Sequence, residues 1–102
     1  REVARIAQEA LVNIRKHSQA RHVIIRLCSS GSSWMLVVDD DGRGFGFSGR
    51  KTHAELDALR KGPVTIKERI RAIRGELTID STPGRGVRLE VTIPHAEHPH
   101  YV

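Results

Sequence analysis

The sequence predicts an α+β domain in which helices cover one face of a mainly antiparallel, mixed sheet. Each half of the chain offers one amphipathic helical segment followed by two alternating strands, and a short turn joins each pair of strands. A connection with little regular pattern separates the two halves. The order helix, hairpin, connection, helix, hairpin therefore predicts a two-layer α/β sandwich rather than a parallel α/β fold.

The composition is that of a soluble globular domain. The 102 residues suffice for one modest core, and 38% hydrophobic with 28% charged residues excludes a disordered chain. No apolar stretch approaches the roughly 18 residues of a membrane span and no signal peptide is visible, so we expect a cytoplasmic domain. Cys28 is the only cysteine, which excludes an intrachain disulfide, and its place in an alternating segment predicts a buried thiol.

The net charge of +5 and the pI of about 10.1 indicate an anionic partner or a solvated basic surface. The basic residues are dispersed, and one tryptophan, one tyrosine and two phenylalanines are too few for a platform that stacks bases. We therefore expect no direct contact with nucleic acid, and favour nucleotide phosphates or solubility as the role of the charge.

The first amphipathic segment, residues 1–16, predicts a helix. Its apolar residues follow helical spacing: Val3, Ile6, Ala7, Ala10, Leu11 and Ile14. Glu9, Asn13 and Lys16 form a polar row beside this stripe, and such a row suits a water, Mg²⁺ and a phosphate. The alternative is a solvated helix face with one Glu–Lys pair. Because the helix begins without a cap, we expect further residues upstream in a longer parent protein.

The stretch around which the chain is organised is the end of the second predicted strand. Residues 22–28 and 34–39 alternate as a hairpin with a turn at 29–33, and three carboxylates at 39–41 then precede glycines at every second position. A desolvated carboxylate needs a donor such as the exocyclic amine of a purine, and glycines let a flat ligand lie against the backbone. The alternative is an ordinary strand-to-loop turn.

Residues 45–61 form the long connection, with one short helical segment at 54–59. Connections of this length without structure of their own are typically lids or disordered segments. The connection carries four cations, Arg50, Lys51, Arg60 and Lys61. They are able to approach a polyphosphate; the alternative is that they are only solvated.

The second helix is predicted from the Gly62-Pro63 pair to about residue 74. Pro63 suits the first helical position; alternatively, Thr65 and Glu68 form a capping box. Either way a helix N-terminus follows the connection and offers N–H groups to an anion. The pattern places Ile66, Ile70 and Ile73 toward the core and Lys67, Glu68, Arg69 and Arg71 toward solvent.

Residues 76–81 and 86–94 alternate on either side of a Thr-Pro-Gly-Arg turn and predict the second hairpin. We expect the domain to end at residue 94. Residues 95–102, which include three histidines, are expected to form a frayed tail that binds metal only adventitiously.

Four stretches carry a family resemblance: residues 8–17 (Gln-Glu-Ala-Leu-Val-Asn-Ile-Arg-Lys-His), 40–45 (Asp-Asp-Gly-Arg-Gly-Phe), 62–69 with its Lys-Glu-Arg run, and 81–86 (Ser-Thr-Pro-Gly-Arg-Gly). In this order they resemble the N box, G1 box, G2 region and last glycine-rich turn of the ATP-binding catalytic domain of two-component sensor histidine kinases, in the superfamily shared with gyrase and MutL. Each stretch alone is weakly specific, whereas their order over residues 1–94 is specific. The Gln-Glu-Ala-Leu opening and the Lys-His pair most resemble kinases that signal to response regulators with helix-turn-helix output domains.

The resemblance implies a Bergerat-type fold that binds ATP and Mg²⁺. Asp40 would accept a hydrogen bond from the adenine amino group, in a pocket shaped by Gly42, Gly44 and Phe45. The implied nucleotide-binding set also includes, at the lid and the last turn, Arg60, Lys61, Gly62 and Val87.

The resemblance also assigns catalytic roles along the first helix. Asn13 would ligate Mg²⁺, and Glu9 would polarise the Mg²⁺ shell at the position that activates water in hydrolysing relatives. Lys16 and His17 would meet the phosphates or the ribose.

Three positions depart from the family pattern. Arg60-Lys61-Gly62-Pro63 stands where Gly-x-Gly-Leu is usual, which predicts altered lid mechanics rather than lost binding. Val87 stands where a threonine commonly follows the last glycine. Arg74 replaces the first glycine of a usual pair, so that Gly75 alone is expected to make that turn.

The implied function is to present the γ-phosphate of Mg·ATP to a histidine on a separate dimerisation domain. None of the six histidines is followed by Asp or Glu, as the family's phosphoacceptor is, so we expect no autophosphorylation by this chain alone. The implied partners are the dimerisation domain and a response regulator; the full-length protein would be a homodimer and this chain a monomer. The alternatives are a degenerate nucleotide-binding or protein-interaction module, and a serine kinase or ATPase of the same superfamily. Membrane anchoring of the parent protein stays open.

Overall fold

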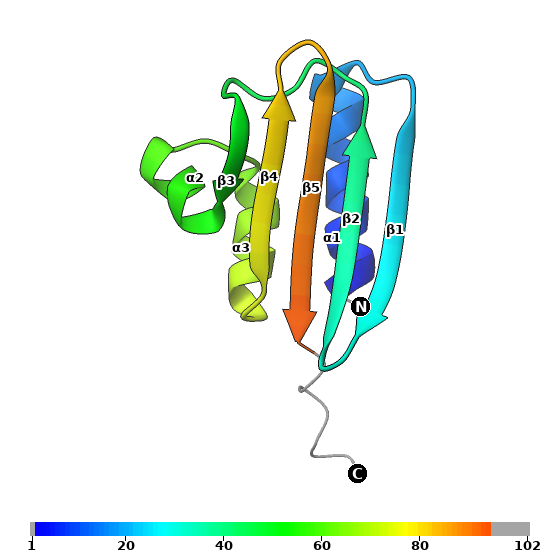
Figure 1. Cartoon of the computed structure of the whole chain (residues 1–102), viewed down its shortest axis with the longest axis vertical. Helices are drawn as coiled ribbons and strands as arrows, with labels where there is room; N and C mark the ends of the chain where they lie inside the picture. Colours follow the sequence, from blue (N-terminus) through cyan, green and yellow to red (C-terminus); the bar gives the residue numbers. More distant parts are fainter. Residues whose placement is uncertain (1, 95–102) are drawn as a thin grey trace.

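The computed structural model describes residues 2–94, apart from the side chains of residues 2, 3, 17, 18 and 30. The elements are α1 (Glu2–Asn13), a π-helical turn η1 (Ile14–Ser18), β1 (Val23–Ser30), β2 (Ser33–Asp40), β3 (Gly49–Thr52), α2 (His53–Leu59), α3 (Val64–Ala72), β4 (Glu76–Thr82) and β5 (Gly86–Pro94). The strands form one sheet in the order β1-β2-β5-β4-β3 (Figure 1). The predicted tail, residues 95–102, lies outside the described residues.

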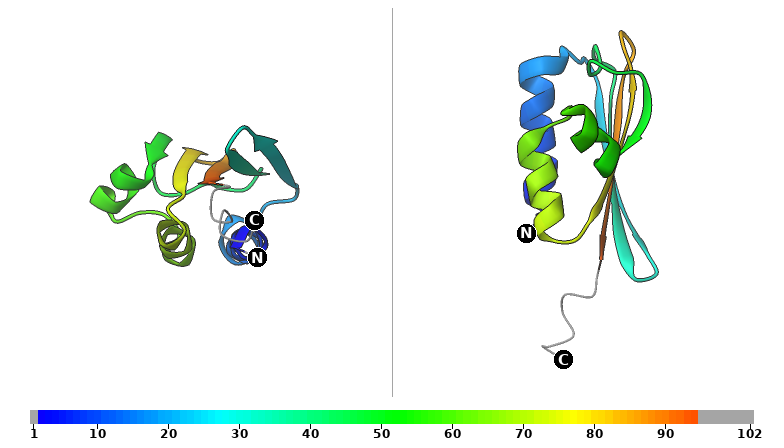
Figure 2. Two further views of the ribbon diagram at one scale, coloured as in Figure 1. Left: turned by 90° about the horizontal axis from the view of Figure 1, so that it is seen from below. Right: turned by 90° about the vertical axis from the view of Figure 1, so that its left-hand side faces the viewer.

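The predicted α+β sandwich is confirmed. All four strand pairings among the described residues are antiparallel, so the sheet expected to be mixed has no parallel pair there. α1 and α3 lie on one face of this sheet, and α2 lies beside β3 (Figure 2). No helix in residues 2–94 is long and apolar enough to span a membrane.

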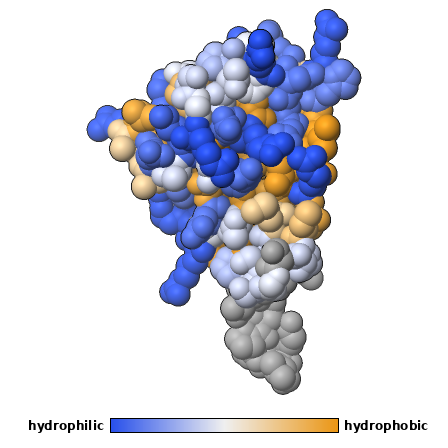
Figure 3. All heavy atoms as spheres, viewed as in Figure 1, coloured by the Kyte–Doolittle hydropathy of each residue, from blue (hydrophilic) through white to orange (hydrophobic). Residues whose placement is uncertain are grey.

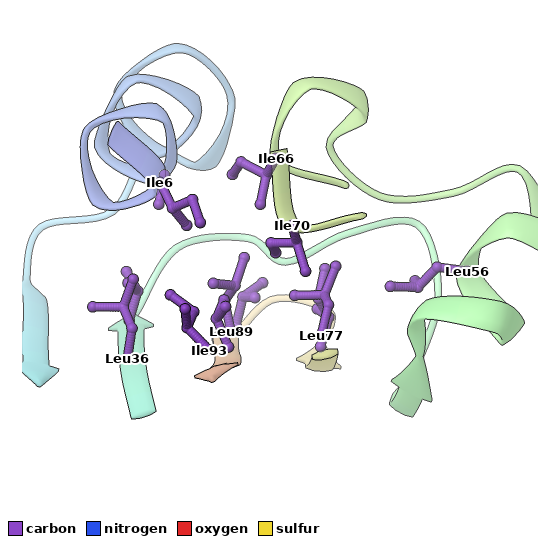
Figure 4. Packing of buried hydrophobic residues seen from close by; sticks show 13 residues of the cluster. Ile6, Leu36, Leu56, Ile66, Ile70, Leu77, Leu89 and Ile93 are labelled. Carbon is purple, nitrogen blue, oxygen red and sulfur yellow. The ribbon is translucent and has the colours of Figure 1, made fainter. Parts of the chain in front are cut away.

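The core fills the layer between the helices and the sheet (Figure 4). Ile6 of α1 and Ile70 of α3 are fully buried, as is Leu56 of α2. The strands contribute every second residue, because side chains alternate between the two faces of a sheet; these are Leu36 and Val38 of β2, Leu77 and Ile79 of β4, and Val87, Leu89, Val91 and Ile93 of β5.

The opposite face of the sheet carries ion pairs between neighbouring strands. Asp39 accepts hydrogen bonds from Arg26 Nη2 of β1 at 2.9 Å and from Arg88 Nε of β5 at 2.8 Å. Arg50 of β3 reaches across to Glu90 of β5, with Nη2 and Oε1 2.8 Å apart. Solvated pairs of this kind contribute little stability individually, but they commit Asp39 to the face away from the helices.

The connection after β2 contains a strand and a helix, so the expected lack of regular structure is wrong, whereas its action as a lid stays a prediction. α2 confirms the predicted short helix, and it begins with a capping box in which Thr52 N donates to Glu55 Oε1 at 2.8 Å and Glu55 N donates to Thr52 Oγ1. β3 was not predicted, because its sequence Gly-Arg-Lys-Thr has no apolar alternation. Pairing with β4 fixes it as a strand.

Both ends of α3 differ in detail from the prediction. Pro63 is the N-cap residue rather than the first helical residue, and no side chain caps this end, so neither predicted start is correct. At the other end Arg74 adopts a left-handed conformation with φ of 58°. Gly75 therefore does not make the turn alone. It is needed because a Cβ there would lie 2.9 Å from the Thr92 carbonyl oxygen.

β1 is an edge strand, and its side chains are exposed on both faces. Ile24, Ile25 and Leu27 are 54%, 40% and 50% exposed, and apolar side chains show along this edge in Figure 3. Cys28 is also exposed, so the predicted buried thiol is wrong, because alternation alone does not distinguish an edge strand from a central one. The turn to β2 is shorter than predicted, since Ser30 already pairs with Ser33.

Candidate functional site

A cavity of about 350 Å³ lies between α1 and α3, over the end of β2 and the start of β5. This volume is within the range of small-molecule sites. The side chains of Asn13 and Asp40 are the polar ones in its lining. The full lining is Ala10, Asn13, Ile14, Val38, Asp40, Gly44, Phe45, Gly62, Pro63, Ile66, Val87 and Leu89.

The three consecutive carboxylates at the end of β2 have three different surroundings. Asp39 faces the ion pairs of the outer face, and Asp40 lines the cavity on the helix side, as strand alternation requires. Asp41 turns back and accepts hydrogen bonds from the backbone N–H groups of Arg21 at 2.8 Å and His22 at 2.9 Å. These bonds, that of His22 first, lower the pKa of Asp41 to about 2. Of the three carboxylates, Asp40 is thus the one that lines the cavity.

The glycine-rich loop after Asp40 is docked on the turn between β4 and β5. Asp40 Oδ1 accepts a hydrogen bond from Gly42 N at 2.7 Å, and Phe45 N donates to the buried Ser81 Oγ at 2.9 Å. Gly44 has a φ of 83°, and a Cβ on it would lie 3.0 Å from Ser81 Oγ. A Cβ on Gly86 would lie 2.1 Å from the Asp40 carbonyl oxygen. Glycine is therefore required at positions 44 and 86 because the two loops approach each other closely. Gly44 also lines the cavity.

The polar row predicted on the first helix does not lie in one place. Asn13, the last residue of α1, lines the cavity. Glu9 lies one turn earlier, outside the lining, and its Oε2 is 3.7 Å from Arg69 Nη2 of α3. Lys16 is exposed in the π-helical turn, which interrupts the 3.6-residue period just after Asn13. The side chain of His17 is outside the described residues.

The connection contributes a second wall and a cation. Gly62 and Pro63 line the cavity, and the uncapped N-terminus of α3 follows them. Arg60 and Lys61 are exposed and do not line it. Lys61 Nζ nevertheless lies 3.3 Å from the position that a Cβ on Gly46 would occupy, so this side chain runs from the residue before Gly62 to the loop beside Phe45.

Of the remaining predicted residues, Gly42 is buried behind Asp40 and Val87 lines the cavity at the start of β5. Sequence reasoning missed the apolar walls, because a cavity wall and a core position share one periodicity. The missed residues are Ala10, Ile14, Val38, Pro63, Ile66 and Leu89.

The arrangement suits a flat heteroaromatic ring that carries an amine. Apolar walls would enclose such a ring, and a carboxylate would accept its N–H. The Asn13 amide oxygen is a hard ligand of the kind that Mg²⁺ accepts, and Mg²⁺ bound mainly through phosphates and water needs only one or two protein ligands. Within the part of the chain that the structure describes, no three or more His, Cys, Asp or Glu residues gather in a way that could hold a metal ion. The residues present thus fit a Mg²⁺ ion that arrives with its phosphates.

Comparison with known proteins agrees with this geometry. The family model described as "Histidine kinase-, DNA gyrase B-, and HSP90-like ATPase" matches residues 1–97. The chain is 33% identical over 90 residues to the signal transduction histidine-protein kinase/phosphatase DegS of Brevibacillus brevis, covering 88% of this chain and 22% of DegS. It is 39% identical over 89 residues to the sensor histidine kinase ComP of Bacillus subtilis, covering 87% of this chain and 11% of ComP.

A solved structure shows the same fold. The histidine kinase domain from a blue-light activated histidine kinase of Erythrobacter litoralis superposes with a TM-score of 0.70 at 21% identity, covering 94% of this chain and 44% of that one. The chain thus spans less than half of this solved domain and less than a quarter of the two curated relatives.

Proposed function

The chain belongs to the histidine kinase-, DNA gyrase B- and HSP90-like ATPase family, and on that premise we propose that it binds Mg·ATP and presents the γ-phosphate to a histidine on a separate dimerisation domain. The observation that carries this proposal is the single cavity lined by both Asn13 and Asp40. The two residues come from motifs far apart in the sequence, and an amide and a carboxylate in an apolar cleft suit the two ends of a nucleotide.

The adenine ring occupies the apolar part of the cavity in this proposal. Asp40 accepts a hydrogen bond from the exocyclic amine, and Val38, Ile66 and Leu89 enclose the ring. The bond from Gly42 N already restrains the Asp40 carboxylate, which lowers the entropy lost when the ligand binds.

The triphosphate extends toward the connection and the N-terminus of α3. Asn13 would hold Mg²⁺, which would neutralise charge on the phosphates. The uncapped N–H groups of α3 favour an anion, further positive charge comes from Lys16, Arg60 and Lys61, and His17 meets the phosphates or the ribose. Glu9, one turn before Asn13 and beside Arg69 of α3, would polarise the Mg²⁺ shell. Catalysis then rests on positioning and charge neutralisation.

The phosphoacceptor and the downstream partner lie on other polypeptide segments. In this proposal the catalytic domain spans residues 1–94, followed by a short tail, and works in the cytoplasm as a monomer when isolated. The full-length protein is a homodimer through its dimerisation domain and transfers the phosphoryl group to a response regulator.

The test compares two neighbouring aspartates. Asp40→Asn is expected to weaken Mg·ATP binding by about 1–3 kcal/mol, or ~5–150-fold, because an amide is a poorer acceptor and places an N–H donor against the amine. Asp39→Asn is the matched control: it removes the same charge one residue away, on the opposite face, and is expected to change affinity less than about twofold. Titration calorimetry measures both.

Unchanged affinity in Asp40→Asn would remove the central assignment. Binding should also fall when magnesium is chelated. An unaltered protein that binds no adenine nucleotide would favour the protein-interaction module, and steady ATP turnover by the isolated chain would favour a hydrolysing ATPase.

A further inference from the structure

Among the described residues of α3, Lys67 is the one charged residue that is buried. Sequence reasoning placed it toward solvent, but it is only 8% exposed. Its Nζ donates to Asp57 Oδ1 of α2 at 2.9 Å and to the carbonyl oxygen of Lys61 at 2.9 Å. A buried ammonium needs such partners, and here one of them belongs to the backbone of the segment that borders the cavity.

The backbone of Lys61 is fixed on both sides. Arg60, the C-cap residue of α2, has a left-handed φ of 56°, and Lys61 N donates to the Leu56 carbonyl at 2.9 Å. With its N–H held by α2 and its carbonyl held by Lys67, this residue has little freedom in either flanking peptide. Gly62 follows with a φ of 90° and packs against Leu56, where a Cβ would lie 3.6 Å from Cδ2.

The side chain of Lys61 connects this turn to a second loop. Its Nζ reaches the loop after β2, next to Gly46, whose neighbour Phe45 lines the cavity. Two residues of the cavity lining thus flank the Lys61 side chain. Gly62 follows Lys61 in the sequence, and Phe45 precedes Gly46, which Nζ approaches.

We propose that Lys67 is a positioning residue for nucleotide binding: by holding the Lys61 carbonyl, it directs the Lys61 ammonium across the mouth of the cavity, where that ammonium meets the phosphate chain. This inference rests on the proposed function. Lys67 is buried and does not line the cavity, but by this inference it affects the binding of the phosphate end of the ligand selectively.

Arg71 provides a matched control for Lys67. Its Nη2 donates to Asp57 Oδ2, so both cations bind the same carboxylate, and the bond from Lys67 comes first among the causes that lower the Asp57 pKa. Arg71 is 57% exposed at its side chain. When Lys67 is replaced, Asp57 keeps Arg71 as a partner, whereas the Lys61 carbonyl loses its donor.

The experiment measures the affinities for Mg·ATP and for adenosine in four variants. Lys67→Met is expected to weaken Mg·ATP binding about tenfold and adenosine binding less than about twofold, because only the phosphates meet Lys61. Lys61→Met should give the same selective loss, and the double variant should be no weaker than either single variant, since both remove one interaction. Arg71→Met should bind both ligands as the unaltered protein does.

Amide hydrogen exchange gives a readout that does not need a ligand. Exchange at Lys61 and Gly62 should accelerate in Lys67→Met and not in Arg71→Met. Equal losses for Mg·ATP and adenosine, additive effects in the double variant, or unchanged exchange would each overturn the proposal. Unchanged affinity in Lys61→Met, an exposed substitution, overturns it even if Lys67→Met fails to fold. Absence of any nucleotide binding in the unaltered protein would instead refute the proposed function, and exchange would then decide whether Lys67 fixes the turn.

Discussion

At the scale of residues, two arginines stand in a backbone conformation that favours glycine. Arg60 and Arg74 have φ values of 56° and 58°, and each follows the last turn of a helix. Around Arg74 the Schellman pattern is complete, because Arg74 N donates to the Arg71 carbonyl and Gly75 N to the Ile70 carbonyl. Both positions were singled out as places where the family pattern has glycine. At both positions arginine therefore adopts the left-handed conformation without the help of a glycine.

Arg74→Gly is expected to stabilise the protein by about 0.5–1 kcal/mol. The left-handed conformation strains a residue with a Cβ, and this relief exceeds the extra entropy that glycine gives the unfolded chain. Urea unfolding at constant slope measures the change. Glu68→Gly, in the interior of α3, is the control and should destabilise by about 1 kcal/mol. A less stable Arg74→Gly protein would contradict this account.

Single side chains were also the least predictable part of the molecule. Lys67 has the charge of a surface residue and the helical position of one, and its burial depends on α2 packing beside α3. Glu9 and Asn13 share a helix face, yet only Asn13 lines the cavity, and the Glu9 carboxylate lies 3.7 Å from Arg69 Nη2 of α3. Such outcomes depend on neighbours distant in the sequence, which periodicity does not report.

At the scale of elements, Asp41 links the end of β2 to the residues that lead into β1. Its carboxylate accepts hydrogen bonds from the backbone N–H groups of Arg21 and His22. It also lies 2.8 Å from His22 Nδ1. Asp41 therefore fixes where the chain enters the sheet after the π-helical turn, close to Asn13.

The stability contributed by Asp41 should depend on pH. Its pKa of about 2 in the folded protein lies below the ordinary 3.8, so its contribution is complete above pH 3.8 and is lost as the pH falls toward about 2. Asp41→Ala should thus be less stable than the unaltered protein above this window, and the difference should shrink through it. Unfolding midpoints measured across the window test this. A difference independent of pH would contradict it, and His22→Ala, which keeps both backbone bonds, should retain most of the dependence.

Most elements could be predicted, because their apolar side chains repeat with a clear period. Both long helices and four of the five strands were found in this way, each within a few residues of its bounds. β3 has no such pattern and exists because β4 offers it a partner. The structure of the connection was missed for the same reason, because Thr52 and Lys67 hold it by hydrogen bonds, which give the sequence no apolar pattern.

At the scale of the whole molecule, stability depends on the layer between the helices and the three inner strands. Leu36 of β2 and Leu27 of β1 are directly paired in register on the same face, yet they are 1% and 50% exposed. The sequence gives no basis for telling them apart. The difference arises because β2 has a neighbour on each side and β1 lies at the edge.

This pair yields a prediction about the core. Leu36→Ala should destabilise the protein by about 2–5 kcal/mol, because it leaves a cavity in a closely packed layer. Leu27→Ala should cost less than about 1 kcal/mol, since its side chain is already half in water. Chemical denaturation of both variants decides the matter, and equal losses would show that β1 is more deeply packed than described.

The position of the cavity is likewise a property of the assembled layers. Asp40, Asn13 and the glycines could be predicted as site residues from their chemistry, whereas Ile66, Leu89 and the other apolar walls could not. Whether an isoleucine fills the core or borders a hollow depends on how far α1 and α3 stand apart above the sheet.

The exposure of β1 bears on how the protein behaves when handled. Within the described residues this strand pairs with β2 alone, so its outer row of peptide groups is open to another strand, and Ile24, Ile25 and Leu27 lie beside it. At high concentration the isolated domain should accordingly aggregate first through the exposed edge of β1. Cys28 lies on the same strand, so air oxidation would convert transient pairs into covalent ones, and storage with a thiol reductant should prolong the life of a preparation.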